Sequence, residues 1–208
     1  MERKIIKVTP VVEEFTITWM IGKFCNYDCM YCPSDWHDDQ SKPHDLETLK
    51  QVWMNIKKKS GHNDLKYKIV ISGGEPTANK SFLPFLEWLR EDDSVSRISV
   101  TTNGSASLKY YERLSDLVES LSFSTHSEFM DERSFFEKVN AISNRMCLNG
   151  KDLHVNVMNE PWNRDRISLY ENYLGKHKIR YTINEIQQDV RTRDEIKNEG
   201  KANIDEIL

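Results

Sequence analysis

Three of the four cysteines lie close together near the start of the chain, at Cys25, Cys29 and Cys32. Cysteine thiolates bind iron–sulfur clusters and zinc, and closely spaced cysteines let a single loop wrap around a metal centre. A disulfide framework usually spreads its cysteines along the chain, so this grouping favours a metal site in a reducing compartment. Three thiolates leave one iron of a four-iron cluster without a protein ligand, and a catalytic cluster needs such an open position.

Other interpretations of these cysteines stay open at this point. His37 lies just downstream and could complete a Cys₃His zinc site, which would make the chain a zinc-stabilised binding module without catalysis. The three cysteines could also be core residues, although a charged loop is an unusual place for them. The fourth cysteine, Cys147, stands alone after a helical pattern, and we interpret it as a small buried residue. The stretch from Trp36 to Asp39 either covers the metal site or is a solvated loop.

A glycine-rich turn is the second stretch with residues suited to chemistry, and it reads Ser72-Gly73-Gly74-Glu75-Pro76-Thr77. Glycine permits unusual backbone dihedrals and a close approach of the backbone to a ligand. Backbone carbonyl groups and the Glu75 carboxylate accept hydrogen bonds from an ammonium group. By itself such a turn is typical of an ordinary structural loop, so its meaning depends on where the fold places it.

Short β-like runs alternate with helical patterns along the chain. Alternating or β-branched residues predict strands near 15–21, 68–72, 98–101, 121–124, 153–157 and 179–183. Apolar residues at helical spacing predict helices near 46–56, 82–89, 111–118, 135–146 and 167–174, with Asp45 as N-cap and Gly61 at the end of the first. Strands separated by helices imply right-handed crossovers and a parallel sheet. We therefore predict an α/β fold, a partial and open (βα)6 parallel barrel, with a flat doubly wound sheet as the alternative.

The polar and thiol-containing stretches all follow predicted strands. The cysteines follow the first strand, Gly73 to Thr77 the second, Thr102 to Gly104 the third, Ser124 to His126 the fourth and Met158 to Glu160 the fifth. In a parallel α/β fold these loops lie on one face, which is the face that binds ligands. The pattern therefore predicts one composite site at the carboxyl ends of the strands.

The chain has 208 residues, which is enough for one sizeable core, and we predict a single domain over 1–208 with a charged C-terminal tail from about residue 187. Hydrophobic residues make up 38% of the chain and charged residues 30%, as in soluble globular proteins. The formal net charge of -4 does not predict a nucleic-acid surface built on positive charge. The sequence contains neither a long apolar run nor a secretory signal, so we expect no membrane span and a cytoplasmic location.

The C-x3-C-x2-C spacing after the first strand, with Tyr31 before the last cysteine, resembles the radical S-adenosylmethionine (SAM) superfamily. The Gly73-Gly74-Glu75-Pro76 turn after the second strand resembles the GGEP motif of the same family. The resemblance implies a [4Fe–4S] cluster on Cys25, Cys29 and Cys32, with SAM on the open iron. It also implies that Tyr31 packs near the adenine and that the turn holds the SAM amino group. SAM would then be cleaved reductively to a 5′-deoxyadenosyl radical that abstracts hydrogen from a substrate.

Residues after the later strands are weaker candidates under the same resemblance. Thr102 and Asn103 would lie beside SAM, although an ordinary turn explains them equally well. Ser124 would contact the ribose, and Asn156 or Asn159 a ribose or carboxylate group, unless these asparagines only satisfy backbone groups. The remaining candidates are substrate contacts or solvated loop residues, namely His126 and Glu185.

The resemblance does not identify the substrate, which could be a small molecule or a peptide side chain. The chain has no cysteine after Cys147, so we expect the cysteine-rich extension of many peptide-modifying relatives to be absent, by nature or by truncation, and we expect no separate leader-binding domain. A compact core of this kind resembles 7-carboxy-7-deazaguanine synthase or the activases of glycyl-radical enzymes. A degenerate core that binds a cluster but only serves a partner protein is a further alternative. An enzyme of this class would take its electron from a reduced flavodoxin- or ferredoxin-type donor.

Overall fold

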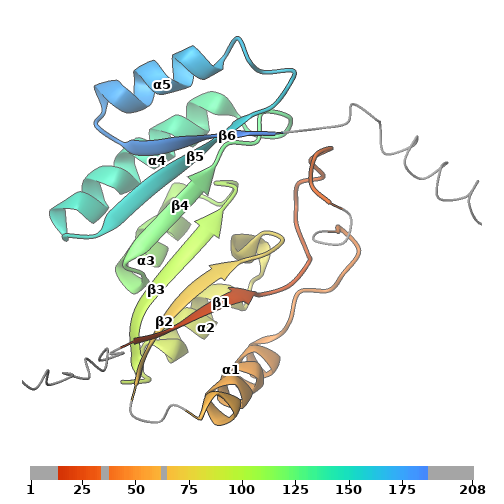
Figure 1. Ribbon diagram of the computed structural model, residues 1–208, viewed down its shortest axis with the longest axis vertical. Coiled ribbons are helices and arrows are strands. Elements are labelled where there is room, and N and C mark those ends of the chain that lie inside the picture. Colours follow the sequence, from red (N-terminus) through yellow and green to blue (C-terminus); the bar gives the residue numbers. More distant parts are fainter. Residues whose placement is uncertain (1–13, 34–37, 62–64, 187–208) are drawn as a thin grey trace, which may run out of the picture.

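The computed structural model describes residues 14–33, 38–61 and 65–186. Six parallel strands form one sheet in the order β1-β2-β3-β4-β5-β6, so every strand pairs with its neighbours along the chain (Figure 1). The strands are β1 (Glu14–Met20), β2 (Lys66–Ser72), β3 (Val95–Thr102), β4 (Ser120–Ser124), β5 (Asp152–Asn159) and β6 (Arg180–Glu185). The helices are α1 (Leu46–Ser60), η1 (Pro76–Ala78), α2 (Phe82–Leu89), α3 (Leu108–Leu117), α4 (Glu132–Leu148) and α5 (Ile167–Lys176).

Within the described residues the sheet is open, with β1 and β6 at its two edges. Alternating βα units of this kind form a partial barrel with a parallel sheet, so the predicted (βα)6 architecture is confirmed. The caps of α1 also agree with the sequence. Asp45 accepts a hydrogen bond from the Thr48 N–H at 2.8 Å, and Gly61 ends the helix in the left-handed conformation at φ 65°.

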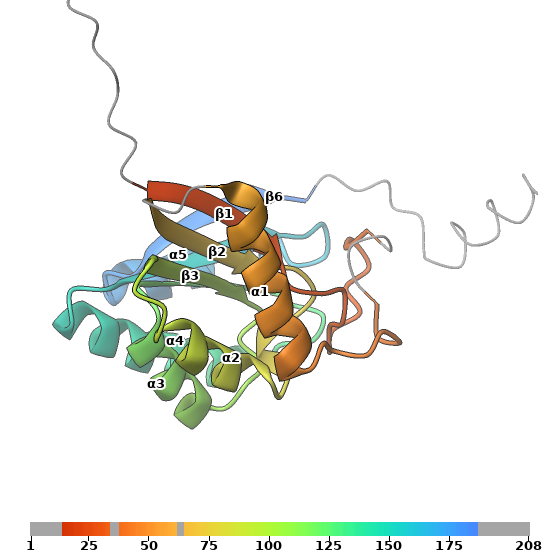
Figure 2. The ribbon, with the colours of Figure 1, turned by 90° about the horizontal axis from the view of Figure 1, so that it is seen from below.

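The two faces of the sheet differ in character. Helices α1 to α4 lie on one side of the sheet (Figure 2), and the strand residues on that side are buried and apolar. Ile69, Val100 and Phe123 represent this face. The alternate residues on the opposite face include many small polar side chains, as at Thr18, Ser99 and Ser122. The helices cover one face of the sheet, and the opposite face forms the polar inner surface of a half-barrel.

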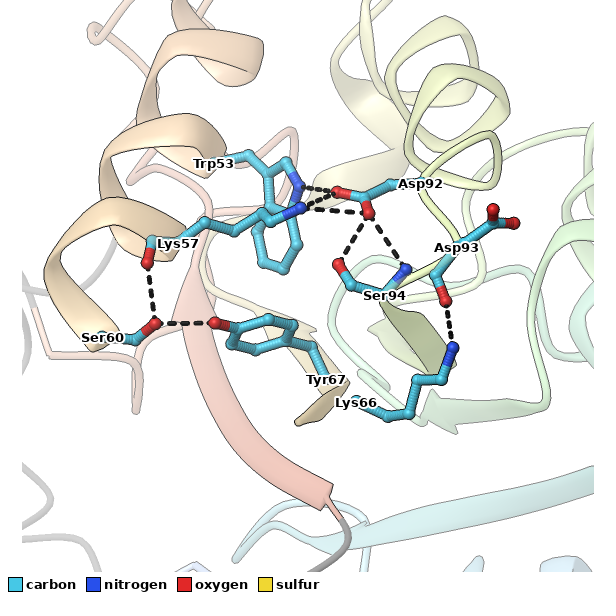
Figure 3. A network of polar contacts seen from close by, with 8 residues as sticks. All are labelled: Trp53, Lys57, Ser60, Lys66, Tyr67, Asp92, Asp93 and Ser94. Atoms are coloured by element: carbon cyan, nitrogen blue, oxygen red, sulfur yellow. Dashed lines mark hydrogen bonds and ion pairs between the residues drawn. The ribbon is translucent and has the colours of Figure 1, made fainter. Parts of the chain in front are cut away.

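A polar network at the amino ends of the strands fixes α1 to the turn before β3 (Figure 3). The Asp92 carboxylate accepts hydrogen bonds from Trp53 Nε1 at 2.9 Å, Lys57 Nζ at 2.8 Å and Ser94 Oγ at 2.6 Å. Beside it, the Ser60 and Tyr67 hydroxyl groups lie 2.7 Å apart. This network lies at the end of the sheet opposite to the carboxyl ends of the strands.

One expectation about the core is wrong. Cys147 is exposed, because it follows the buried Met146 on the last turn of α4 and successive helix residues point about 100° apart. The charged stretch from about residue 187 lies outside the described residues, and the single domain over 1–208 stays a prediction. Among the described residues, no helix is both long enough and apolar enough to cross a membrane.

Candidate active site

A cavity of about 300 Å³ opens at the carboxyl ends of β1 to β4. Most of the sequence-predicted site residues line it together, namely Cys25, Cys29, Tyr31, Cys32, Gly73, Gly74, Glu75, Thr102, Asn103, Ser124 and His126. Four further residues line the cavity, of which the sequence analysis missed Met20, Tyr27 and Thr101 and named Ser72 only as the first residue of the glycine-rich turn. Of these, Met20, Ser72 and Thr101 belong to strands, and their strand alternation toward the inner face is the signal that could have found them.

Other candidates lie outside this cavity. Pro76 lines a neighbouring cavity of about 260 Å³. Asn156 lies beside Ser124 on the neighbouring strand β5, with its side-chain amide donating to Ser124 Oγ at 3.4 Å. The exposed Glu185 at the end of β6 accepts a hydrogen bond from Asn159 Nδ2 at 2.7 Å. His37, the proposed fourth ligand of the zinc alternative, lies outside the described residues, as does Trp36.

The cysteine loop is closed at its base by backbone hydrogen bonds. Cys25 N–H donates to the Asp38 carbonyl at 3.0 Å, and Asp38 N–H donates to the Lys23 carbonyl at 3.0 Å. Within the loop, Cys32 N–H donates to the Cys29 carbonyl at 3.0 Å, which makes a tight turn between these two cysteines. The chain therefore leaves β1, presents three thiols to one cavity and returns beside its own starting point.

The electrostatic setting of the thiols is poor in positive charge. Burial raises the pKa of Cys25 to about 11 and that of Cys29 to about 12, and it also raises the pKa of Cys32. The carboxylates of Glu75 and Glu128 add to the shifts at Cys25 and Cys29 respectively. Among the described residues, no lysine or arginine lines the cavity. Three such thiols ionise together only around metal cations, so the donor set fits an iron–sulfur cluster.

The glycine turn lies directly on the start of the cysteine loop. Gly73 and Gly74 have φ values of 89° and 44°, which L side chains rarely adopt. A Cβ atom at Gly74 would stand 2.1 Å from the Phe24 carbonyl oxygen, and Glu75 N–H donates to that same oxygen at 2.8 Å. The glycine at position 74 is therefore required for contact between two protein loops, in addition to any approach to a ligand.

The Glu75 carboxylate is fully buried and ties three loops together. Its Oε1 atom accepts hydrogen bonds from Thr77 N–H at 2.9 Å, Thr77 Oγ1 at 2.6 Å and Thr102 Oγ1 at 2.8 Å. Its Oε2 atom accepts one from Asn103 N–H at 2.5 Å. Burial raises the pKa of Glu75, and these hydrogen bonds oppose that effect. Because Oε1 is saturated by the protein, only Oε2 retains capacity for an ammonium group.

Asn103 connects this carboxylate to the cysteine loop. Its backbone N–H binds Glu75, while its side-chain Nδ2 donates to Asn26 Oδ1 at 3.0 Å. Ser105 N–H donates to Asn103 Oδ1 at 3.0 Å and so fixes the orientation of the amide. Asn26 is a site residue that the sequence analysis missed, since no motif marks a residue between two metal ligands.

Tyr31 and His126 form a stacked pair next to Cys29. Their rings lie nearly parallel, at 8°, with centroids 6.0 Å apart, and the Tyr31 hydroxyl contacts His126 Nδ1. Burial lowers the pKa of His126 to about 4, so the imidazole is neutral at pH 7. His126 is therefore a half-buried neighbour of the thiols, and the alternative of a solvated loop residue does not hold.

Comparisons with known proteins agree with this geometry. The Radical SAM superfamily matches residues 19–146. A GTP 3′,8-cyclase from Pasteurella multocida is 38% identical over 85 residues, which cover 40% of this chain and 24% of that protein. A 7-carboxy-7-deazaguanine synthase from Clostridium acetobutylicum is 30% identical over 129 residues, which cover 62% of this chain and 53% of that protein. The chain thus spans about a quarter to a half of these two curated relatives.

Solved structures share the fold at low sequence identity. Streptococcus suis SuiB bound to its precursor peptide SuiA superposes with a TM-score of 0.60 at 15% identity, covering 94% of this chain and 46% of SuiB. The enzyme anSMEcpe with bound AdoMet gives a TM-score of 0.56 at 16% identity, covering 84% of this chain and 50% of that one. The family match does not favour the zinc-module alternative. Since that match includes the cysteine loop, the glycine turn and the strands that carry them, the chain belongs to the radical SAM superfamily.

Proposed function

We propose that this protein is a radical SAM enzyme in which Cys25, Cys29 and Cys32 hold a [4Fe–4S] cluster and the neighbouring loops hold SAM. The observation that carries the proposal is the Phe24 carbonyl oxygen, which accepts the Glu75 N–H at 2.8 Å and thereby sets the cysteine loop against the glycine turn. With both cofactors bound, the cluster would supply one electron to SAM, whose sulfur–C5′ bond would break to give methionine and a 5′-deoxyadenosyl radical able to take a hydrogen atom from the substrate.

The residues around the cavity would bind different parts of SAM. The backbone carbonyls of Gly73 and Gly74, with Glu75 Oε2, would accept hydrogen bonds from the SAM ammonium group. The buried Ser124 hydroxyl, oriented by Asn156, would bind a ribose hydroxyl. Tyr31 supplies an aromatic surface for the adenine. Thr102 and Asn103 would act mainly by holding Glu75 in place, which refines their predicted role as direct ligands.

For the substrate we propose only a class, which is either a small molecule or a peptide side chain. The names of the curated relatives, GTP 3′,8-cyclase and 7-carboxy-7-deazaguanine synthase, support a small molecule. The structural neighbour bound to a precursor peptide supports a peptide. The electron would come from a reduced flavodoxin or ferredoxin in the cytoplasm. The activase of a glycyl-radical enzyme stays an alternative within the same chemistry.

The proposal is tested by anaerobic cluster reconstitution followed by an assay for 5′-deoxyadenosine, with dithionite as reductant and SAM as the only cosubstrate. We expect a brown protein that releases 5′-deoxyadenosine, and we expect the Cys29→Ala variant to release none. The Cys147→Ala variant is the matched control, because Cys147 is exposed on α4 and lies outside the cavity. Full SAM cleavage by the Cys29→Ala protein, or a colourless protein loaded with zinc, would overturn the assignment.

A further inference from the structure

His126 makes a polar contact with one of the three thiols. It follows β4 directly, and its Nδ1 atom lies 3.4 Å from the Cys29 Sγ atom, across 97 residues of sequence. Cys29 is the most buried of the three cysteines, with a relative exposure of 5%. A polar hydrogen aimed at this sulfur is therefore little screened by water.

The direction of the hydrogen bond follows from the chemistry of a bound thiolate. A sulfur that binds iron has lost its proton and only accepts, so the nitrogen that faces it must donate. Neutral imidazole carries one N–H, and this contact selects the tautomer with the hydrogen on Nδ1.

The Tyr31 hydroxyl, which contacts the same nitrogen, has a second acceptor nearby. The carboxylate of Glu160, a residue without exposed surface that follows β5, lies near this hydroxyl. Among the described residues, Glu160 Oε1 has no hydrogen-bond partner. Tyr31 can therefore turn its hydrogen toward Glu160, and the His126 N–H is then shared between the Tyr31 oxygen and the Cys29 sulfur as a bifurcated hydrogen bond.

We propose that His126 is a positioning residue that donates a hydrogen bond from Nδ1 to the cluster sulfur of Cys29 and thereby raises the reduction potential of the cluster. A hydrogen bond to a cluster sulfur withdraws electron density and stabilises the reduced state, which carries one more negative charge. Stacking on Tyr31 fixes the plane of the imidazole, and a Tyr31 hydrogen that points to Glu160 leaves Nδ1 free to carry its own hydrogen. The inference rests on the proposed ligation of iron by Cys29.

The test compares His126→Phe with His126→Asn. Phenylalanine retains a flat ring against Tyr31 but has no donor, whereas the asparagine amide places an N–H close to the position of Nδ1. The quantity measured is the midpoint potential of the reconstituted cluster without SAM, from redox titrations followed by electron paramagnetic resonance. We expect a roughly tenfold lower ratio of reduced to oxidised cluster for His126→Phe at fixed ambient potential, equivalent to about 59 mV for a one-electron couple. We expect His126→Asn to lie close to the wild type.

Equal potentials for the wild type and His126→Phe, at equal iron content, would overturn the inference, and so would equal shifts in both variants. If His126→Phe fails to assemble a cluster, the inference is tested by spectroscopy on the wild-type protein. With ¹⁵N-labelled histidine, pulsed spectroscopy of the reduced cluster should detect one weakly coupled ¹⁵N nucleus, and its absence would overturn the inference. Because potentials and couplings are measured without SAM, failure here is distinct from failure to cleave SAM.

Discussion

Gly74 lies so close to Phe24 that a Cβ atom added to it would stand 2.1 Å from the Phe24 carbonyl oxygen. No real Cβ atom occupies such a position, and the obstacle is backbone that cannot rotate away. The contact joins the two segments that carry the strongest family motifs. Their spacing is therefore set by protein packing, before any cofactor binds.

Replacing Gly74 by alanine should force the glycine turn and the cysteine loop apart and destabilise the protein. The positive φ alone costs about 1–3 kcal/mol, and the clash adds to it. Gly61→Ala is the matched control, because Gly61 has a φ of 65° but nothing within 4 Å of its added Cβ. Urea unfolding should show a clearly larger loss for Gly74→Ala, together with loss of iron uptake. Equal losses in the two variants would contradict this account.

Removing the Asn103 amide should loosen the cysteine loop while leaving the backbone bond to Glu75 intact. Asn103→Ala and Asn26→Ala delete the two ends of one hydrogen bond of 3.0 Å, so their effects on stability should be non-additive by about 0.5–1.5 kcal/mol. The measurement is a double-mutant cycle of unfolding free energies, with iron content recorded for each protein. Asn144→Ala, on the exposed side of α4, serves as the control. Additive effects would show that the amides act separately.

The Asp92 network should make stability depend on pH in the acid range. The hydrogen bonds from Lys57, Ser94 and Trp53 outweigh partial burial and lower the pKa of Asp92 to about 2, below its ordinary value of 3.8. A carboxyl group with a depressed folded pKa stabilises the protein above its unfolded pKa, and the benefit is lost as the pH falls from about 4 toward 2. Asp92→Asn should therefore cost about 1–2 kcal/mol at pH 7 and progressively less below pH 4.

Asp93→Asn is the control for this measurement, because Asp93 contributes its backbone carbonyl to the Lys66 ammonium group in Figure 3. Denaturant unfolding of both variants at pH 7 and pH 3 provides the comparison. A difference between Asp92→Asn and the wild type that stays constant over this range would exclude the carboxylate as its source.

Lys138 on α4 should act as a clamp on the loop after β3. Its Nζ donates to the Gly104 carbonyl at 2.5 Å and the Ala106 carbonyl at 3.0 Å. Lys138→Met keeps the apolar stem and removes both bonds, so we expect about 1–3 kcal/mol of destabilisation. Amide exchange over residues 102–106 should become faster. Lys109→Met, at an exposed position of α3, should leave that exchange unchanged.

The parts of the site that the sequence predicted are local in the chain. The thiols of Cys25, Cys29 and Cys32 are close because one short loop carries them, and hydrophobic periodicity located the strands before each polar loop. The contacts of Asn26 with Asn103 and of Cys29 with His126 span 77 and 97 residues, and they arise only when neighbouring parallel strands fix the loops side by side. No local pattern specifies which side chains then meet. Cys147 was wrongly predicted to be buried, because a small apolar residue next to a buried methionine can lie on either the buried or the exposed side of a helix.

The open sheet has a mechanical consequence. A closed barrel keeps its curvature because its first and last strands are hydrogen-bonded, whereas here β1 and β6 are both edges. The cysteine loop starts at the β1 edge and contacts Glu75 after β2, Asn103 after β3 and His126 after β4. It therefore braces the mouth of the half-barrel across four strands. Binding of metal by this loop should stiffen the curvature of these four strands, so that metal uptake also fixes the shape of the cavity at their carboxyl ends.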